Sequence, residues 1–273
     1  MTRLTRPVLS TLTALVMVGT LFLGAPAPSF AADPPIIYYI AQSGTAASTP
    51  GDGTSCAAPD YVEDPAGADH ASISSALAPA SNGDTIYLCA GTYDIGTTID
   101  LAGETITLQG AAAATTILDG GGTTRILTSS GAITVSDLTF QDGSSADDGG
   151  AIFATTATVS NSTFTSNISV NQGGAISAST GAVVGSRFTR NTSGTHGGAI
   201  YFASPALTDL KLMRRNSFSR NTAAVGGAMT FGPCVTPSRS QAARVERANH
   251  FSGNRATEQR RTNNIERLEG GCG

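Results

Sequence analysis

Small, apolar and aromatic residues recur along the middle of the chain with a single period. Gly-Gly-Ala recurs at spacings of 24, 24 and 29 residues, beginning at Gly149, Gly173, Gly197 and Gly226. A phenylalanine column keeps nearly the same spacing, with Phe140, Phe164, Phe188, Phe218 and Phe251 lying 24, 24, 30 and 33 residues apart. Two independent markers that share a period indicate a repeat architecture.

Other columns appear when the segments are aligned on these markers. Apolar residues that we expect to face the interior are Val135, Val159, Val183 and Met213, and, after each Gly-Gly-Ala, Ile152, Ile176, Ile200 and Met229. An asparagine follows each phenylalanine by three residues in the later repeats, at Asn167, Asn191, Asn221 and Asn254. This column is typical of stacked turn residues, because Asn tolerates left-handed backbone and its amide can bond to its neighbours.

Columns one period apart predict a chain that winds into coils, each pairing in parallel with the next at a rise of about 4.8 Å. The fold class is therefore all-β, a single-stranded parallel β-helix of about 24 residues per coil, and the usual crossover hand makes it right-handed. A helical solenoid is excluded because the segments are β-branched and broken every few residues. Earlier strands at 85–89, 105–110, 115–121 and 125–130 bring the total to about seven coils.

The two ends interrupt this pattern. Residues 71–80 predict a short helix that caps the first coil, within an N-terminal segment at 32–84. The β-helix occupies 85–273, and an Arg-rich insertion makes its C-terminal coils irregular. Residues 1–31 read as a signal peptide, with Arg3 and Arg6 before the apolar run from Val8 to Leu23; a retained anchor is the alternative. The mature chain then has no integral membrane segment and is secreted or held at the cell envelope or surface.

Four cysteines fall two near each end of the predicted mature chain. We expect disulfides between Cys56 and Cys89 and between Cys234 and Cys272, because exported chains oxidise such pairs. Each would close a loop of a few tens of residues, worth about 3–4 kcal/mol in the chain-entropy account. Metal binding is the alternative, but C-x-x-C spacing is absent.

Charge is divided along the chain, although the net value of −4 hides the division. Residues 33–186 hold fifteen acids and only Arg125, whereas residues 187–273 hold thirteen bases and five acids. The simpler interpretation is solvated coil edges. The sharper one is a rod whose two ends contact different surfaces or stack on each other.

The markers Gly-Gly-Ala-Ile and Phe-x-x-Asn resemble the repeats of polymorphic outer membrane proteins over residues 140–254. Upstream, residues 74–93 look like the N-terminal coil of the wider pectin-lyase-like β-helix superfamily, and they end in Gly-Asp-Thr-Ile-Tyr-Leu-Cys-Ala-Gly-Thr-Tyr. The resemblance implies a surface-exposed or secreted protein, adhesin-like in its best-known relatives. The wider superfamily also contains polysaccharide lyases, hydrolases and esterases, so the resemblance implies such an enzyme as an alternative function.

The candidate site residues stand in and beside the variable column that precedes each Gly-Gly. If the protein is an enzyme, Asp148 and His196 are the best catalytic candidates, two coils and about 10 Å apart. Binding candidates beside them are Asp147, Gln172 and Asn171. The simpler account is that these are solvated turn residues. The chain shows no metal-ligand spacing and no phosphate loop, so we expect no metal and no cofactor.

The glycine, phenylalanine and asparagine residues of the repeat are all explained by their structural roles in the coils, so they say little about activity. We therefore expect a non-enzymatic secreted or cell-surface protein that binds a carbohydrate or another envelope polymer. The alternative is a carbohydrate-active enzyme of the pectin-lyase-like kind. A nucleic-acid partner is not expected, because the Arg-rich segment lacks interleaved aromatic residues.

Overall fold

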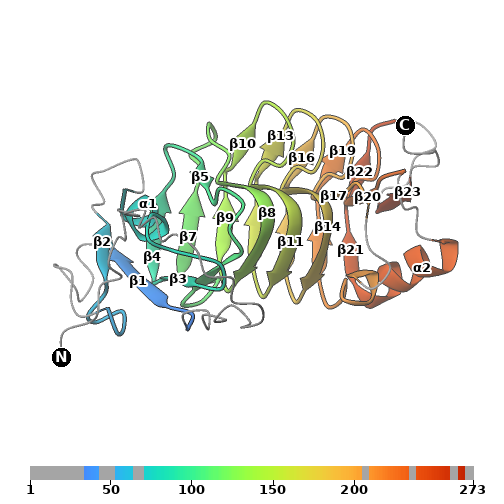
Figure 1. Cartoon of the computed structure of the whole chain (residues 1–273). Helices are drawn as coiled ribbons and strands as arrows, with labels where there is room; N and C mark the ends of the chain where they lie inside the picture. The colour runs from blue at the N-terminus through green and yellow to red at the C-terminus, as the bar shows by residue number, and fades with distance from the viewer. Residues whose placement is uncertain are drawn as a thin grey trace, which may run out of the picture. The chain divides into compact units, whose positions relative to one another are not determined.

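The computed structural model describes residues 34–42, 53–63, 71–204, 209–233, 238–258 and 264–267. Over these residues the chain forms a solenoid of parallel strands, and Figure 1 shows successive coils stacked along one axis. The expected signal peptide and the expected Cys234–Cys272 disulfide lie outside the described residues. The predicted class, an all-β parallel solenoid, is confirmed.

Three parallel sheets form the sides of the solenoid. The eleven-stranded sheet contains β1 (Ile37–Gln42), β2 (Tyr61–Glu63), β3 (Thr85–Leu88), β5 (Ile99–Asp100), β6 (Ile106–Gly110), β8 (Leu127–Ser136), β11 (Ile152–Ser160), β14 (Ile176–Val184), β17 (Ile200–Phe202), β20 (Met229–Phe231) and β23 (Ile265–Arg267). The seven-stranded sheet contains β4 (Gly91–Asp94), β7 (Thr116–Asp119), β9 (Thr139–Gln141), β12 (Thr163–Thr165), β15 (Arg187–Thr189), β18 (Ser217–Ser219) and β21 (His250–Ser252). The five-stranded sheet contains β10 (Ser144–Ser145), β13 (Ile168–Ser169), β16 (Thr192–Ser193), β19 (Thr222–Ala223) and β22 (Arg255–Ala256).

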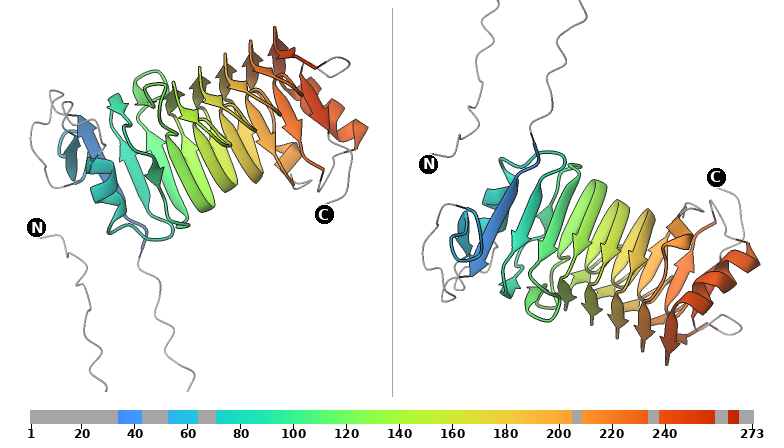
Figure 2. Two further views of the ribbon diagram at one scale, coloured as in Figure 1. Left: turned by 90° about the horizontal axis from the view of Figure 1, so that it is seen from above. Right: turned by 90° about the horizontal axis from the view of Figure 1, so that it is seen from below.

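Most coils contribute one strand to each sheet that they join, whereas β5 and β6 both pair with β8 in the eleven-stranded sheet. Five coils, from β8-β9-β10 to β20-β21-β22, contribute to all three sheets, and two earlier coils, β3-β4 and β6-β7, contribute to two. The two views of Figure 2 show these strands lying side by side along the axis. Insertions that lengthen the later repeats leave the parallel register intact.

The phenylalanine column is the centre of the core. Phe140, Phe164, Phe188 and Phe218 are fully buried, and successive rings stack with centroids 4.8–4.9 Å apart and planes within 9°. Register continues this column backward through Leu118 to Tyr93, which the repeat pattern did not reveal. The predicted isoleucine and valine columns also align in register and face inward.

The asparagine column forms a continuous hydrogen-bonded ladder, as predicted. Nδ2 of Asn167 donates to Oδ1 of Asn191 and Nδ2 of Asn191 donates to Oδ1 of Asn221, each at 3.0 Å. The asparagines themselves do not occupy left-handed backbone, contrary to the stated reason for the column. The residue before each asparagine does, with φ of 57° at Ser166 and 57° at Arg190. The asparagine is selected by its buried amide and its neighbour makes the turn.

The opposite corner carries a second polar ladder that sequence reasoning missed. Ser162 Oγ accepts a hydrogen bond from Leu138 N at 3.3 Å, and Ser186 Oγ accepts one from Ser162 N at 3.1 Å. Asn216 Oδ1 continues the series by accepting from Ser186 N at 2.8 Å. Because this column changes from serine to asparagine along the axis, no single residue type marked it.

The N-terminal end differs in part from expectation. Helix α1 (Ala71–Leu77) is present but ends before Pro79, which has no N–H to continue a helix. The strand at 85–88 is not the first, because β1 pairs with it and β2 pairs with β1. Both strands lie outside the repeat, so no column predicted them. The expected disulfide between Cys56 and Cys89 is formed.

The Arg-rich insertion is partly helical. Helix α2 (Arg239–Ala248) begins with a capping box, in which Ser238 and Gln241 each bond to the other's backbone N–H. Its single fully buried side chain is Val245, and it packs beside the 3-10 turn η1 (Asp209–Lys211) and β21. Among the described helices, none has the length and apolar character needed to cross a membrane.

Candidate functional site

The column before each Gly-Gly is built in register, as predicted. Gln172 forms a parallel bridge with His196, and His196 forms one with Val225. Asp148 lies one coil before Gln172, and its Oδ1 accepts a hydrogen bond from Gln172 N at 3.0 Å. The corner beneath needs glycine, because Gly149 has φ 59° and a β-carbon there would collide with the carbonyl oxygen of Ile152.

A pocket of about 260 Å³ opens beside this column on the outer face of the eleven-stranded sheet. Its polar groups come from four coils and include the carboxylate of Asp148, the amide of Gln172 and the hydroxyls of Ser129, Ser177 and Ser179. Strands β8, β11, β14 and β17 carry most of the lining, and Asp148 and Gln172 stand in the turns that precede β11 and β14. The structure therefore brings two of the predicted site residues, Asp148 and Gln172, into one concave surface.

Two aromatic side chains that sequence reasoning missed line the same pocket. Phe153 pairs with Ser177, and Ser177 pairs with Tyr201, so the rings belong to one outward-facing column two coils apart. Phe153 is 40% exposed, whereas Tyr201 is 7% exposed. The signal was present in the sequence: each follows an inward isoleucine, and strand alternation sends the next residue outward.

Arg125 fixes the corner that carries Asp148. Its Nη2 donates to Ser145 Oγ at 2.6 Å and to the Asp148 carbonyl oxygen at 2.9 Å, and its Nε donates to the Gly149 carbonyl oxygen at 3.1 Å. Its guanidinium carbon lies 5.3 Å from the centre of the Phe153 ring. Burial lowers the pKa of Arg125, and the negative charges of Asp147 and Asp148 oppose that shift.

The other predicted site residues lie beside the pocket rather than in its lining. Asp147 and Asn171 are exposed and stack through their backbones, with Asn171 N donating to the Asp147 carbonyl oxygen at 3.0 Å. His196 is partly buried, with its ring 6.1 Å from that of Tyr201 and tilted by 47°. The two proposed catalytic residues, Asp148 and His196, are therefore separated by the Gln172 rung.

Two ionisable side chains, those of Asp148 and Tyr201, line the pocket. Burial raises the pKa of Tyr201, and the negative charge of Asp148 raises it further. The phenol is thus a neutral hydrogen-bond donor near neutral pH. Among the described residues, no group of three or more His, Cys, Asp or Glu side chains is placed to hold a metal ion.

Two consecutive coils of the chain match the repeat of a known protein family. Residues 161–179 and 185–203 each match the Chlamydia polymorphic membrane protein repeat. Comparisons with curated proteins and with solved structures gave no match. The matched segments contain Gln172, Ser177 and Tyr201 of the pocket but not Asp148 or Phe153. The β12–β14 and β15–β17 coils of this solenoid are thus similar to the repeat of the Chlamydia polymorphic membrane proteins.

Proposed function

We propose that this protein is a surface-exposed, adhesin-like β-helix that binds carbohydrate in the pocket beside Asp148. The repeat similarity supports the surface-exposed, adhesin-like part, because polymorphic membrane proteins are the proteins that carry this repeat. Secretion through the predicted signal peptide is part of the same proposal. The observation that carries the ligand class is the combination of Phe153 with Asp148, Gln172 and serine hydroxyls in one pocket.

A sugar ring matches this lining in both of its chemical aspects. Its C–H face is apolar and packs against the exposed ring of Phe153, while its hydroxyls need directional partners. The carboxylate of Asp148 accepts hydrogen bonds, and hydrogen bonds to a charged group are stronger than those between neutral groups. The phenol of Tyr201, the amide of Gln172 and the hydroxyls of Ser177 and Ser179 complete a set of donors and acceptors.

Glycan binding by the purified chain tests this proposal. A neutral oligosaccharide found on a glycan array should bind Phe153→Ala and Asp148→Asn about 10-fold more weakly or worse, since each substitution removes about 1.4 kcal/mol or more. Asn at position 148 keeps an oxygen for the Gln172 N–H, so the corner should stay folded. Asp147→Asn is the matched control, because this neighbouring carboxylate lies outside the lining. Equal losses of affinity in Asp148→Asn and Asp147→Asn would contradict binding in this pocket.

A polysaccharide-cleaving activity is the second candidate, and the shared pocket of Asp148 and Tyr201 is what favours it. A carboxylate and a phenol that line one pocket supply a proton acceptor and a proton donor, the two groups that acid–base catalysis requires. Release of reducing ends or unsaturated products from polysaccharides by the purified chain would support this function. Loss of product in Tyr201→Phe with retained glycan binding would assign the proton donor.

A further inference from the structure

The two corners that flank the seven-stranded sheet change from acidic to basic along the axis. Three residues before each of the first four phenylalanines, the corner holds Asp137, Asn161, Gly185 and Arg215. Two residues after each phenylalanine, the other corner holds Asp142, Ser166, Arg190, Arg220 and Gly253. These two columns, on one side of the solenoid, therefore follow the division of charge seen in the sequence.

These corner arginines stand in backbone that arginine adopts at a cost. Arg215 has φ 59°, and Arg190 and Arg220 each have φ 57°, the left-handed region in which a β-carbon is crowded. Glycine avoids that cost and stands in the same columns at Gly185 and Gly253. Backbone geometry therefore gives no reason for arginine at these corners. What arginine adds over glycine is an exposed guanidinium group, and we attribute its presence to that group.

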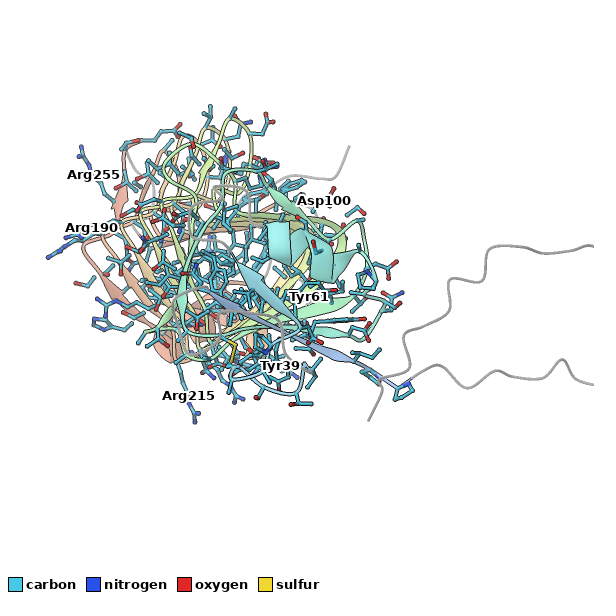
Figure 3. All side chains as sticks on the ribbon, turned by 90° about the vertical axis from the view of Figure 1, so that its left-hand side faces the viewer. Tyr39, Tyr61, Asp100, Arg190, Arg215 and Arg255 are labelled. Atoms are coloured by element: carbon cyan, nitrogen blue, oxygen red, sulfur yellow. A yellow bond between two sulfur atoms is a disulfide. The ribbon has the colours of Figure 1, made fainter. Side chains whose placement is uncertain are left out.

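Further cations extend these corners into one surface. Arg187 points outward from β15, between the two corners, and Arg247 of α2 lines a pocket of about 380 Å³ with Arg215, Ser217 and His250. We call Arg187, Arg190, Arg215, Arg220 and Arg247 the basic strip. All five are exposed, and within the part of the chain that the structure describes none lies in an ion pair with a carboxylate. In the end-on view of Figure 3, Arg190 and Arg215 point away from the solenoid.

The surface between these charges is flat and hydroxylated. Arg190 and Arg220 are one coil apart, about 4.8 Å, and the two corners are separated by the length of a strand, about 16 Å. Thr189 and Ser219 lie between the corners with their hydroxyl oxygens 3.1 Å apart. None of the large exposed hydrophobic side chains of the described residues lies on a strand of the seven-stranded sheet. This lining suits an extended, hydroxyl-rich polyanion better than the apolar centre of a protein interface.

We propose that the basic strip binds an acidic polysaccharide, one whose repeating units carry carboxylate or sulfate groups. Guanidinium groups match both anions through paired N–H donors, and the hydroxyls of Thr189 and Ser219 match the sugar. This site is independent of the pocket beside Asp148, since it lies on the seven-stranded sheet and recognises charge. A chain with both sites would hold neutral and acidic regions of an envelope or matrix polymer at once.

Binding of the full chain to immobilised heparin and to polygalacturonate in 0.1 M salt tests the proposal. We expect the triple variant Arg190→Asn, Arg215→Asn, Arg220→Asn to bind about 100-fold more weakly, from about 5-fold for each cation near an anionic surface. Asparagine tolerates left-handed backbone and occupies it at Asn161, so this variant should be at least as stable as the native chain. Its melting temperature separates lost binding from lost folding.

The matched control removes equal charge elsewhere. Lys211→Gln, Arg239→Gln, Arg244→Gln takes three cations from outside the strip and should keep affinity within about 5-fold. Equal weakening of both triple variants would show that net charge, not the strip, drives binding and would overturn the proposal. Absence of binding to either polysaccharide, or tighter binding to anionic lipid vesicles or duplex DNA, would overturn the assignment of the ligand. Loss of neutral-glycan binding in the pocket variants leaves this result unchanged.

Discussion

Asn167 and Asn191, one coil apart, share two hydrogen bonds through a single oxygen. Oδ1 of Asn191 accepts from both N and Nδ2 of Asn167, each at 3.0 Å. Asn191 in turn donates from Nδ2 to the Phe164 carbonyl oxygen and to Oδ1 of Asn221. One buried amide therefore satisfies backbone and side-chain groups in three coils, which explains why the repeat holds asparagine rather than serine at this corner.

Removing that amide should be costly. We expect Asn191→Ala to lower the free energy of unfolding by about 3 kcal/mol or more, because it leaves buried donors and acceptors in two neighbouring coils without partners. Urea denaturation measures the change. The matched control is Asn171→Ala, an exposed asparagine whose loss should cost less than about 0.5 kcal/mol. Similar losses at the two positions would mean that the ladder contributes little.

The stacked phenylalanines make a second stability prediction. Phe188 is fully buried between two rings, so Phe188→Ala should cost about 3–5 kcal/mol through lost burial and a residual cavity. Phe251 ends the column and is only partly buried, so Phe251→Ala should cost roughly half as much. Chemical denaturation of both variants gives the comparison. Equal costs would show that stacking at the C-terminal coil is as tight as in the centre.

The sequence predicted the interior of this fold better than its ends, for a physical reason. An inward column admits few residue types, so Phe140 and Ile152 recur one period later as Phe164 and Ile176, and the period is visible. The edges lack such a constraint. Strand β1 forms because Tyr38 and Ile40 bury against β3, a contact that occurs once and leaves no repeat.

The candidate site was predicted only in part for the same reason. Asp148 and Gln172 were found because they precede the visible Gly-Gly marker. Phe153 and Tyr201 were missed because outward positions vary freely from coil to coil, and Ser177 stands between them. Arg125 was missed because its partners are mainly carbonyl oxygens of a neighbouring coil, which no sequence pattern records.

A buried hydroxyl in the five-stranded sheet offers a stabilising substitution. Ser193 Oγ is buried without a hydrogen-bond partner in the described structure, and the next rung of its column is Ala223. We expect Ser193→Ala to raise the free energy of unfolding by about 1 kcal/mol, because it removes an unsatisfied polar group. Ser169→Ala, one coil earlier, is the control and should destabilise, since Ser169 Oγ donates to the Gln172 carbonyl oxygen at 3.1 Å.

Asp142 should make stability depend on pH. Burial raises the pKa of this carboxyl above its usual value, and the negative charge of Asp119 raises it further. The folded state therefore holds a proton at Asp142 more tightly than the unfolded state does. It follows that stability falls as pH rises from the ordinary aspartate pKa through the raised one, and the penalty is complete above the raised pKa.

Asp142→Asn should remove that penalty. Asparagine has no charge to oppose Asp119 and also tolerates the left-handed backbone at this corner, where φ is 49°. We expect the variant to be more stable than the native chain by about 0.5 kcal/mol at pH 7, the size typical of an exposed charge pair. At pH 3, where the native Asp142 is largely protonated, the difference should shrink toward zero. Thermal unfolding at the two pH values measures it, and an equal gain at both would assign the effect to backbone geometry alone.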